Sequence, residues 1–370
     1  MQSKKIKLLE SGTPFFEALE EALQKAKESI YIQVYILADD ETGKQIVALL
    51  EKAVAKGVQV FVLVDAFGSK ELSKGYIQDI EKKDIYFRKF SPFIFWKLKI
   101  GRRLHQKLIV IDDKIALIGG INIANKYAGY KTAAWLDYAV CIENELAKYA
   151  LLIAKQLWGK KRKISTELNF SNKTNKILQQ DIWRGKREIA KAYEKAIKEA
   201  KKEIIIVASY FLPNRNFMKL LQKTAERGVK IRLIFSHQSD VPVFQRATTF
   251  LYQDLCKYGI KIYEYIPSVV HAKVMLVDKK WATVGSYNLN ALSYWGSVEL
   301  NFATNDNDLI EELYNHLQKI IHSDSLEIDH TFLKSQHLFI STLNYYLVRF
   351  ILRFFTWLFR KAKNHRKNEE

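Results

Sequence analysis

The sequence contains very little cysteine. Its 370 residues include only Cys141 and Cys256, with no C-x-x-C pair and no cluster of cysteine and histidine at the spacing of metal ligands. Neither a disulfide scaffold nor a structural zinc site is therefore indicated, and a reducing compartment fits the composition. The N-terminal segment MQSKKIKLLESG also lacks an apolar core after its lysines, which argues against a secretory signal peptide.

Acidic residues are scarce relative to basic ones. The chain has 59 Lys and Arg against 40 Asp and Glu, a formal net charge of +19, and an isoelectric point near 9.5. This excess predicts a polyanionic partner, either nucleic acid or an anionic membrane surface, without choosing between them. Because 48% of the residues are hydrophobic, the chain is expected to be globular and to form two or more domains with full cores.

The two halves of the sequence repeat each other. EEALQKAKESIYIQVYIL resembles YEKAIKEAKKEIIIVASYFL, and KAVAKGVQVFVLVD resembles KTAERGVKIRLIFS. Three landmarks recur 166 to 175 residues apart: Tyr35 and Tyr210, Gly57 and Gly228, His105 and His271. Each half has the order helix, buried strand, helix, strand, which predicts α/β units with a mostly parallel sheet. The repeat predicts two homologous domains related by a pseudo-twofold axis.

The domain boundaries follow from composition. We expect the first domain at residues 1–158 and the second at residues 182–330. Residues 159–181 are rich in Lys, Asn and Ser and show no sustained apolar period, so they are predicted to form a basic linker. Residues 331–370 are expected to form a separate C-terminal segment.

A histidine and a lysine begin an apolar strand pair in each half. HQKLIVIDDKIALIGGIN starts at His105 and HAKVMLVDKKWATVGSYN at His271, and both predict β-hairpins. Residues i and i+2 share one face of a strand, so each hairpin presents an imidazole, an ammonium and a carboxamide together. With two-residue turns at Asp113-Lys114 and Lys279-Lys280, the facing pairs are His105 and Asn122, Lys107 and Gly120, His271 and Asn288, and Lys273 and Ser286.

These residue types suit a phosphate rather than a metal ion. A charged lysine has no lone pair and repels a cation, whereas Lys107, Lys273, Asn122 and Asn288 can all donate to phosphate oxygens. One histidine can attack phosphorus while the other protonates the leaving alkoxide, with no metal and no cofactor. Electrostatic stabilisation is the largest expected contribution, with roughly 3 kcal/mol lost for each key donor removed.

Four acidic residues accompany the hairpins. Asp112 and Asp278 lie an odd number of residues from their histidines, on the opposite strand face and beside the turn, which predicts a structural role. Asp137 and Glu299 are better candidates for orienting the imidazoles, because a catalytic histidine usually needs a third group to fix its tautomer.

The two copies of H-x-K-x4-D followed by G-[GS]-x-N resemble the paired HKD motifs of the phospholipase D superfamily. VLVDAFGS, RLHQKLIVID and YEKAIKEAKKEIIIVASYFLPN are among further stretches similar to bacterial cardiolipin synthases, over residues 5–307. The longer cardiolipin synthases begin with transmembrane helices, so the chain resembles the short form.

The resemblance implies two phospholipase D-like α/β/α sandwich domains and metal-independent phosphatidyl transfer through a phosphohistidine. It implies His105 as nucleophile, His271 as acid and base, and hydrogen bonds between these imidazoles and the carboxylates of Asp137 and Glu299. Asp112 and Asp278 join Lys107 and Lys273 in the candidate catalytic set as signature residues. The implied reaction transfers a phosphatidyl group from phosphatidylglycerol to a second phospholipid, giving cardiolipin; hydrolysis of phospholipid or nucleic acid is the alternative.

Two further stretches favour lipid over nucleic acid as the partner. In FSPFIFWKLKIGRR, residues 90–103, aromatic side chains (Phe93, Phe95, Trp96) adjoin cations (Lys97, Lys99, Arg102, Arg103). Such a mixture suits the headgroup region of an anionic membrane containing phosphatidylglycerol and cardiolipin. A basic lid over the pocket and a stacking surface for single-stranded nucleic acid are alternatives.

The second stretch is the C-terminal LFISTLNYYLVRFILRFFTWLFRKAKNHRK. On a helical wheel, one narrow polar stripe crosses an otherwise apolar surface: Thr342, Arg349, Arg353, Thr356 and Arg360. Arginine costs roughly 2.5 to 3.5 kcal/mol at mid-bilayer, which disfavours a spanning helix. We expect an amphipathic helix in the interface with the tail RKAKNHRK on anionic headgroups, holding the protein peripherally on the cytoplasmic side of the cell membrane. Docking on its own domain or a partner chain is the alternative.

Overall fold

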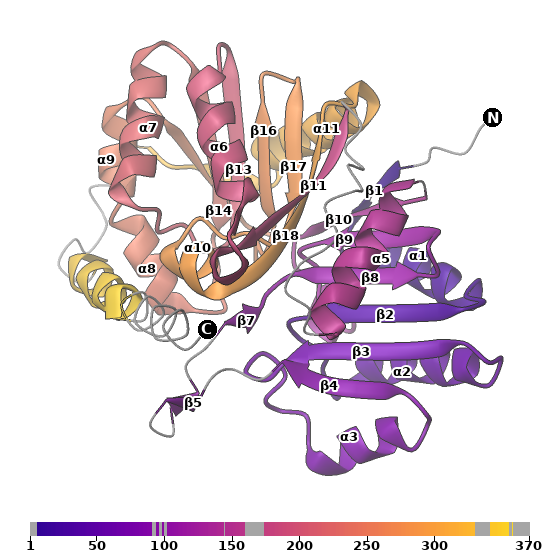
Figure 1. Cartoon of the computed structure of the whole chain (residues 1–370). Coiled ribbons are helices and arrows are strands. Elements are labelled where there is room, and N and C mark those ends of the chain that lie inside the picture. Colours follow the sequence, from indigo (N-terminus) through magenta and orange to yellow (C-terminus); the bar gives the residue numbers. More distant parts are fainter. Residues whose placement is uncertain are drawn as a thin grey trace.

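The computed structural model describes residues 6–90, 94–95, 98–99, 102–143, 145–159, 174–329, 341–354 and 357. Two α/β domains lie side by side, the first in indigo to magenta and the second in pink to orange (Figure 1). Each domain is built around one mixed sheet with helices on both faces. The predicted class, two homologous α/β/α sandwich domains, is confirmed.

The sheet of the first domain has seven strands. In spatial order they are β1 (Ile6–Glu10), β10 (Tyr138–Ile142), β9 (Ile115–Gly119), β8 (Lys107–Ile111), β2 (Ser29–Val34), β3 (Gln59–Asp65) and β4 (Tyr86–Phe90).

The sheet of the second domain repeats this order. Its strands are β12 (Lys186–Arg187), β11 (Asn175–Asp181), β18 (Ser297–Thr304), β17 (Trp281–Gly285), β16 (Lys273–Val277), β13 (Glu203–Ala208), β14 (Lys230–Ser236), β15 (Lys261–Tyr265) and β19 (Ser325–Glu327). The run from β11 to β15 matches the run from β1 to β4 strand for strand, and this is the predicted repeat.

The expectation of a mostly parallel sheet is wrong. Only β2, β3 and β4, and their counterparts β13, β14 and β15, run parallel. The motif hairpins and the strands beyond them pair antiparallel. The reason is that a hairpin reverses the chain between neighbouring strands, whereas a helical crossover preserves its direction.

Helices cover the outer face of each sheet. They are α1 (Thr13–Gln24), α2 (Glu41–Val54), α3 (Lys74–Glu81) and α4 (Asn125–Ala128) in the first domain, and α6 (Glu188–Glu199), α7 (Arg215–Glu226), α8 (Pro242–Thr249), α9 (Tyr252–Lys257) and α10 (Ala291–Gly296) in the second, where a short 3-10 turn (Ile182–Arg184) precedes α6. Asp40 caps α2 through Gly43 N–H, and Asn214 caps α7 through Phe217 N–H.

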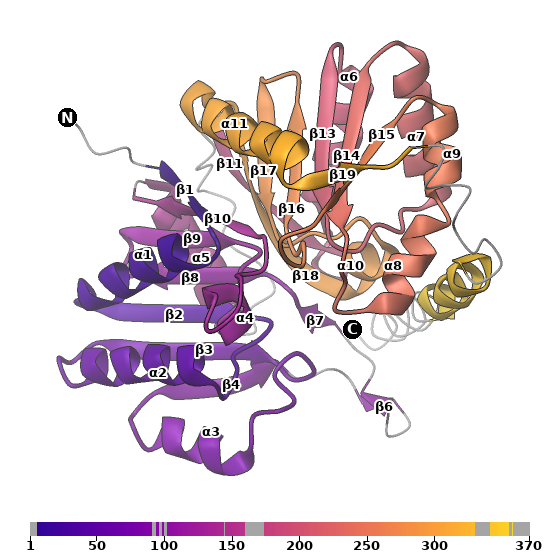
Figure 2. The same cartoon turned by 180° about the vertical axis from the view of Figure 1, so that it is seen from behind.

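The inner faces of the two sheets meet in a shared core. Helix α5 (Glu145–Trp158) lies across the first sheet (Figure 1) and α11 (Asn307–Ser323) across the second (Figure 2). One buried cluster joins Leu108 and Val140 of the first domain to Leu300, Phe302 and Leu309 of the second. The domains are therefore held together by apolar burial rather than by a linker alone.

The predicted linker is too long at its C-terminal end. Asn175–Asp181, inside the expected linker at residues 159–181, forms β11 and pairs antiparallel with β18. Its polar composition predicted a solvent-exposed segment, but Asn175 and Gln180 are buried. Asn175 accepts a hydrogen bond from the Thr304 hydroxyl, and Gln180 donates one to the backbone oxygen of Tyr294. Residues 160–173 lie outside the described part of the chain.

The predicted register of both hairpins is wrong by one residue. Lys107 faces Gly119 rather than Gly120, and Ile111 faces Ile115 across a three-residue loop. In the second copy Val277 faces Trp281. The cause is that Asp112 and Asp278 take left-handed φ values of 53° and 54°, so each loop begins at the aspartate.

The C-terminal segment forms a helix at residues 341–354, drawn in yellow beside α8 and α9 (Figures 1 and 2). Val348 and Leu352 are buried in the outer core of the second domain, and Tyr345 stacks on Phe250 with ring centroids 4.3 Å apart. This edge of the helix docks on its own domain, which was the alternative to an interfacial helix. Thr356, Arg360 and the basic tail lie outside the described residues.

Among the residues described, no helix combines the length and apolar character needed to cross a bilayer.

Candidate active site

His105 lies where the chain of the first domain crosses onto the second. Strand β7 (Arg103–Leu104) pairs in parallel with β18, with Leu104 beside Val298. The backbone N–H groups of His105 and Gln106 both donate to Val298 O, at 3.0 and 2.7 Å. The first motif histidine is therefore fixed by backbone bonds to the opposite domain.

His271 is fixed in the same way by the first domain. Leu136 and Val270 form an isolated parallel bridge. His271 N–H donates to Leu136 O at 2.8 Å, and Leu136 N–H donates to Val269 O at 2.9 Å. Each domain thus holds the histidine of the other.

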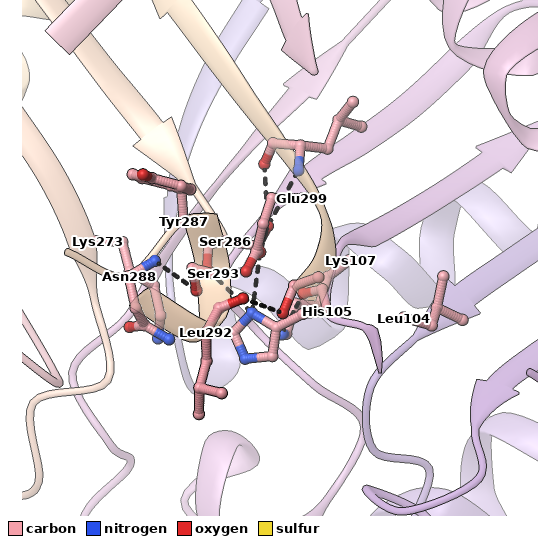
Figure 3. A network of polar contacts seen from close by, with 12 residues as sticks. Leu104, His105, Lys107, Lys273, Ser286, Tyr287, Asn288, Leu292, Ser293 and Glu299 are labelled. Carbon is pink, nitrogen blue, oxygen red and sulfur yellow. Dashed lines mark hydrogen bonds and ion pairs between the residues drawn. The ribbon is translucent and has the colours of Figure 1, made fainter. Parts of the chain in front are cut away.

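This exchange brings each imidazole to a carboxylate of the other domain, since Glu299 follows Val298 and Asp137 follows Leu136. His105 Nδ1 lies 2.9 Å from Glu299 Oε2 (Figure 3), and His271 Nδ1 lies 2.6 Å from Asp137 Oδ2. A carboxylate favours the tautomer that carries hydrogen on Nδ1, which leaves the Nε2 lone pair of both rings for chemistry.

The motif lysines are buried beside the histidines. Lys107 Nζ donates to His105 O at 2.6 Å, while Lys273 Nζ donates to His271 O and lies 3.0 Å from His271 Nδ1. Burial, aided by the charge of Lys273, lowers the pKa of Lys107 to about 7. Burial lowers the pKa of Lys273 to about 8, against the raising effect of Asp137. An arriving anion would stabilise both ammonium groups.

The charges of the two halves act on one another. Burial lowers the pKa of His105 even though Glu299 opposes it, and burial with the charges of Lys273 and Lys107 lowers the pKa of His271 well below its usual value. Burial raises the pKa of Asp137 to about 7 against the charge of Lys273. Both imidazoles therefore favour the neutral form at neutral pH, and the charged groups of the two motifs act on one another.

The two motif asparagines differ. Asn122, expected to bind phosphate, uses its amide in the wall of the site: Oδ1 accepts from Ile36 N–H at 3.0 Å and Nδ2 donates to the Tyr127 hydroxyl at 2.9 Å. Asn288 Oδ1 is buried and has no hydrogen-bond partner in the described part of the chain. No side-chain hydrogen bond of Asn288 is found among the described residues, so its Nδ2, which can donate to an anion, is the motif amide better placed to meet a ligand, and it is drawn with Lys273 in Figure 3.

The second residue of the G-[GS] pair, Gly120 in the first motif and Ser286 in the second, lies against the acidic side chain that contacts the histidine. Its size differs with the length of that acidic side chain. A Cβ on Gly120 would meet Asp137 Oδ1 at 2.2 Å, so only glycine lets this short side chain reach His271. The equivalent Ser286 donates its hydroxyl to Glu299 Oε2 at 2.5 Å (Figure 3). The G-[GS] alternation of the sequence thus supports the two carboxylates in different ways.

Asp112 and Asp278 lie at the hairpin loops, away from the imidazoles, which corrects their inclusion among the candidate catalytic residues. The carboxylate of Asp112 accepts from the backbone N–H groups of Lys27, Glu28 and Ser29. Asp278 accepts from the equivalent backbone at residues 201–203. Both tie the loop to the turn before the central strand, in agreement with the structural role expected from their strand face.

Aromatic residues that the sequence analysis did not select line the site. Tyr35 lies edge-on to His105 with ring centroids 5.0 Å apart, and Tyr127 lies edge-on to His271 at 5.2 Å. The Trp135 ring is 6.0 Å from that of His271. Tyr35 has a repeat counterpart in Tyr210, which was a usable signal, whereas Tyr127 and Trp135 have no distinguishing pattern in one sequence.

The basic aromatic stretch at residues 90–103 is described only in part. The backbone forms a small hairpin of β5 (Ile94–Phe95) and β6 (Leu98–Lys99). Arg102 pairs with the buried Asp181 at 3.1 Å, and Arg103 lies over the Phe67 ring at 5.0 Å. Phe93, Trp96 and Lys97, and the side chains of Phe95 and Lys99, lie outside what the structure describes.

Comparison with known proteins identifies the class first. The family model described as "Cardiolipin synthase, PLD-like domain" matches residues 19–158 and 193–321. The crystal structure of phosphatidylserine synthase from Haemophilus influenzae Rd KW20 superposes with a TM-score of 0.73 at 17% identity, over 95% of this chain and 94% of that one. Polyphosphate kinase from Porphyromonas gingivalis gives 0.60 at 14% identity, over 94% of this chain and 53% of that chain. At these identities both likenesses concern the fold alone.

Sequence relatives narrow the class. Cardiolipin synthase B of Escherichia coli K12 and that of Salmonella typhi are each 32% identical over 377 residues, which cover 96% of this chain and 91% of theirs. A cardiolipin synthase of Halalkalibacterium halodurans is 29% identical over 314 residues, 81% of this chain and 62% of its own length. The chain belongs to the cardiolipin synthase family with phospholipase D-like domains, and the resemblance drawn from its motifs is confirmed.

Proposed function

We propose that this chain synthesises cardiolipin by transferring a phosphatidyl group between two molecules of phosphatidylglycerol. The observation that carries the proposal is the pair of imidazole–carboxylate contacts, His105 with Glu299 and His271 with Asp137, each formed across the domain interface. Two Nε2 atoms and two lysines in one buried site suit a double displacement at one phosphorus. Family membership supports the identity of the lipid substrates.

In the first step His105 Nε2 attacks the phosphorus of phosphatidylglycerol. A P–N bond forms, the P–O bond to the glycerol headgroup breaks, and His271 donates a proton to the departing glycerol oxygen. The lowered pKa of His105 keeps this ring unprotonated for attack. His271 starts neutral, so the anionic phosphate must raise the pKa of its imidazole before it can act as an acid.

In the second step the hydroxyl of another phosphatidylglycerol attacks the phosphohistidine. An O–P bond forms, the P–N bond breaks, and His271 accepts the proton of the hydroxyl. Lys107, Lys273 and Asn288 stabilise the charge on the phosphoryl oxygens throughout, which is the largest expected contribution to the rate. The products are cardiolipin and one glycerol, and no metal enters the balance.

The test is product analysis with the purified protein and phosphatidylglycerol vesicles without added metal. Equal amounts of cardiolipin and free glycerol are expected. Formation of phosphatidic acid instead of cardiolipin would mean that the protein hydrolyses phosphatidylglycerol, and it would contradict the proposed transferase activity. Full activity of His105→Ala or His271→Ala would contradict the assigned roles. With phosphorus-labelled lipid, a label on His105 that resists alkali and is released by acid is expected for a phosphohistidine.

We also propose that the C-terminal helix binds an anionic membrane. Val348 and Leu352 form the edge of the helix that packs on the second domain. A second group of apolar residues on the same helix is exposed: Leu343, Tyr346, Leu347, Phe350, Ile351, Phe354 and Trp357. Phe350 is 69% exposed and Tyr346 62%. An uncovered aromatic stripe of this size, next to the exposed Arg353 and on a chain of charge +19, suits the interface of a phosphatidylglycerol-containing bilayer.

The cytoplasmic side is proposed because Cys141 and Cys256 are both free thiols, which fits a reducing compartment. Membrane binding is tested by sedimentation with vesicles of phosphatidylglycerol or phosphatidylcholine. Phe350→Ser should weaken binding to phosphatidylglycerol vesicles roughly tenfold, the value of about one buried aromatic contact. Leu326→Ser, at a 48% exposed leucine on β19, is the matched control. Equal binding by both variants would contradict the helix as the membrane contact.

A further inference from the structure

Among the differences between the two halves of the site, one concerns charge and lies four residues after the motif asparagines. Lys126 follows Asn122 by four residues, in α4, and the same position of the second repeat is Leu292, in α10, four residues after Asn288. Leu292 appears with the polar network of the second half in Figure 3 and brings no charge to it. The first half of the site therefore carries a cation that has no counterpart in the second half.

Lys126 lies on the side of His271. Its Nζ is 4.1 Å from the centroid of the Trp135 ring, and the Trp135 and His271 rings are 6.0 Å apart. The charge of Lys126 is among the causes that lower the pKa of His271. The ammonium and this imidazole thus both lie against the Trp135 ring, and the ammonium is close enough to act electrostatically on His271.

Lys126 is half-buried, and its ammonium makes no ion pair with any residue that the structure describes. Burial lowers the pKa of Lys126, and among the carboxylates that oppose this shift Asp240 acts most strongly, ahead of Glu71 and Asp40. The Tyr210 hydroxyl donates to both oxygens of Asp240, at 2.7 and 2.9 Å. The aromatic rings of Trp135 and Tyr127 stabilise this ammonium without using its N–H groups, which leaves them to donate to an anion.

The proposed reaction needs a binding position for a second phosphate on the His271 side of the site. An in-line displacement brings the attacking hydroxyl to phosphorus on the side opposite the His105 nitrogen, where His271 removes its proton. When the acceptor is phosphatidylglycerol, three glycerol carbons join that hydroxyl to a second phosphate, which must lie just beyond His271. We propose that Lys126 binds the phosphate of the acceptor phospholipid, an inference that rests on the proposed function and assigns the acceptor to the His271 side of the cleft.

The experiment compares two acceptors in one enzyme. Exchange of labelled free glycerol into phosphatidylglycerol uses the same donor and the same attacking hydroxyl but no acceptor phosphate. Lys126→Gln should lower cardiolipin formation roughly ten- to a hundredfold, the usual loss for one charge-assisted hydrogen bond, and leave glycerol exchange within about twofold. Lys126→Arg should restore much of the cardiolipin formation because its charge is retained. The matched control is Lys131→Gln, at a lysine that also lies over an aromatic ring, 5.1 Å from that of Tyr130, but is exposed.

The outcomes separate this inference from the proposed function. An equal fall of both activities in Lys126→Gln would assign the lysine to the donor phosphate and overturn the inference, and so would no change in either. If the unmodified protein exchanged glycerol but formed no cardiolipin, the proposed function would fail instead. Lys131→Gln is expected to leave cardiolipin formation unchanged. If it instead lowered cardiolipin formation as much as Lys126→Gln does, the effect would come from the net charge of the surface, and the inference would be overturned.

Discussion

At the residue scale, each imidazole takes its carboxylate from the other domain. Asp137 and Glu299 were selected from the sequence because a catalytic histidine needs an orienting group, and the structure brings both to imidazole nitrogens. Which carboxylate serves which histidine was not readable, because it depends on β7 pairing with β18 and on Leu136 pairing with Val270. Such long-range backbone pairing leaves no periodic trace in a sequence.

Glu299→Gln should lower kcat roughly a hundred- to ten-thousandfold while the protein stays folded. The amide cannot stabilise the positive charge that the His105 ring gains when its Nε2 bonds to phosphorus, and it can offer an N–H where Nδ1–H needs an acceptor, so the other tautomer becomes favoured. Steady-state kinetics on phosphatidylglycerol vesicles with a circular dichroism spectrum would check both parts. Gln318→Glu, an amide–acid exchange at a residue bonded to Arg232 and remote from the motifs, is the control. Retention of wild-type kcat by Glu299→Gln would remove its orienting role.

The pH dependence should follow the two lysines. Their pKa values are lowered to about 7 for Lys107 and about 8 for Lys273, so in the free enzyme each loses its charge as pH rises through that value. Phosphate binding weakens with this loss, so kcat/KM should begin to fall near pH 7 and should fall more steeply above about pH 8. The bound phosphate raises both pKa values, so the fall in kcat should come at higher pH.

Lys273→Arg tests this assignment, because a guanidinium remains charged throughout the range. The variant is expected to be slower at every pH and to keep the fall near pH 7 that Lys107 causes, but to lose the further fall of kcat/KM above about pH 8. An unchanged alkaline fall would mean that another group controls it.

At the scale of elements, the strands and helices were predictable and their pairing was less so. The order helix, strand, helix, strand in each half and the glycines after α2 and α7, at φ 87° and 86°, agree with the sequence pattern. Strand β11 was interpreted as linker because its polar residues are satisfied by distant partners such as Thr304. The hairpin register was missed because three backbone N–H groups from a remote turn hold Asp112 in a left-handed conformation.

Asp112→Ala should therefore cost stability and not chemistry. It removes acceptors from the backbone N–H groups of residues 27–29 and leaves a positive φ without the aspartate that favours it, at roughly 2 to 3 kcal/mol in the free energy of unfolding. Urea denaturation gives this value, and kcat per folded molecule should stay within about twofold. Asp113→Ala, at the half-exposed next residue, is the control and should change stability by less than about 0.5 kcal/mol. A large loss of kcat in folded Asp112→Ala would mean that Asp112 contributes to catalysis, and it would contradict the purely structural role.

At the scale of the whole molecule, the same backbone pairings that join the two domains also place the histidines of the active site. The residues of the two backbone bridges that carry the histidines belong to apolar clusters shared by both domains, Leu104 and Val298 to one and Leu136 and Val270 to another. The repeated motifs predicted that two halves would share one site, but not that each would complete the other through exchanged segments. Relative motion of the domains would change both imidazole–carboxylate distances together, so tight packing of the interface is a condition of catalysis.

Leu309→Ala tests this dependence. Leu309 lies on α11, inside the cluster shared with Val140 of the first domain, and is remote from the motif residues. Leu50→Ala opens a cavity of the same kind in the outer core of the first domain. Both should lower the free energy of unfolding by roughly 2 to 5 kcal/mol. Only Leu309→Ala should also lower kcat severalfold at temperatures where the protein is folded, since a loosened interface misplaces each imidazole relative to its carboxylate, and misplacement of about 1 Å is costly. Equal kcat values for the two variants would mean that the domains keep their alignment without this packing.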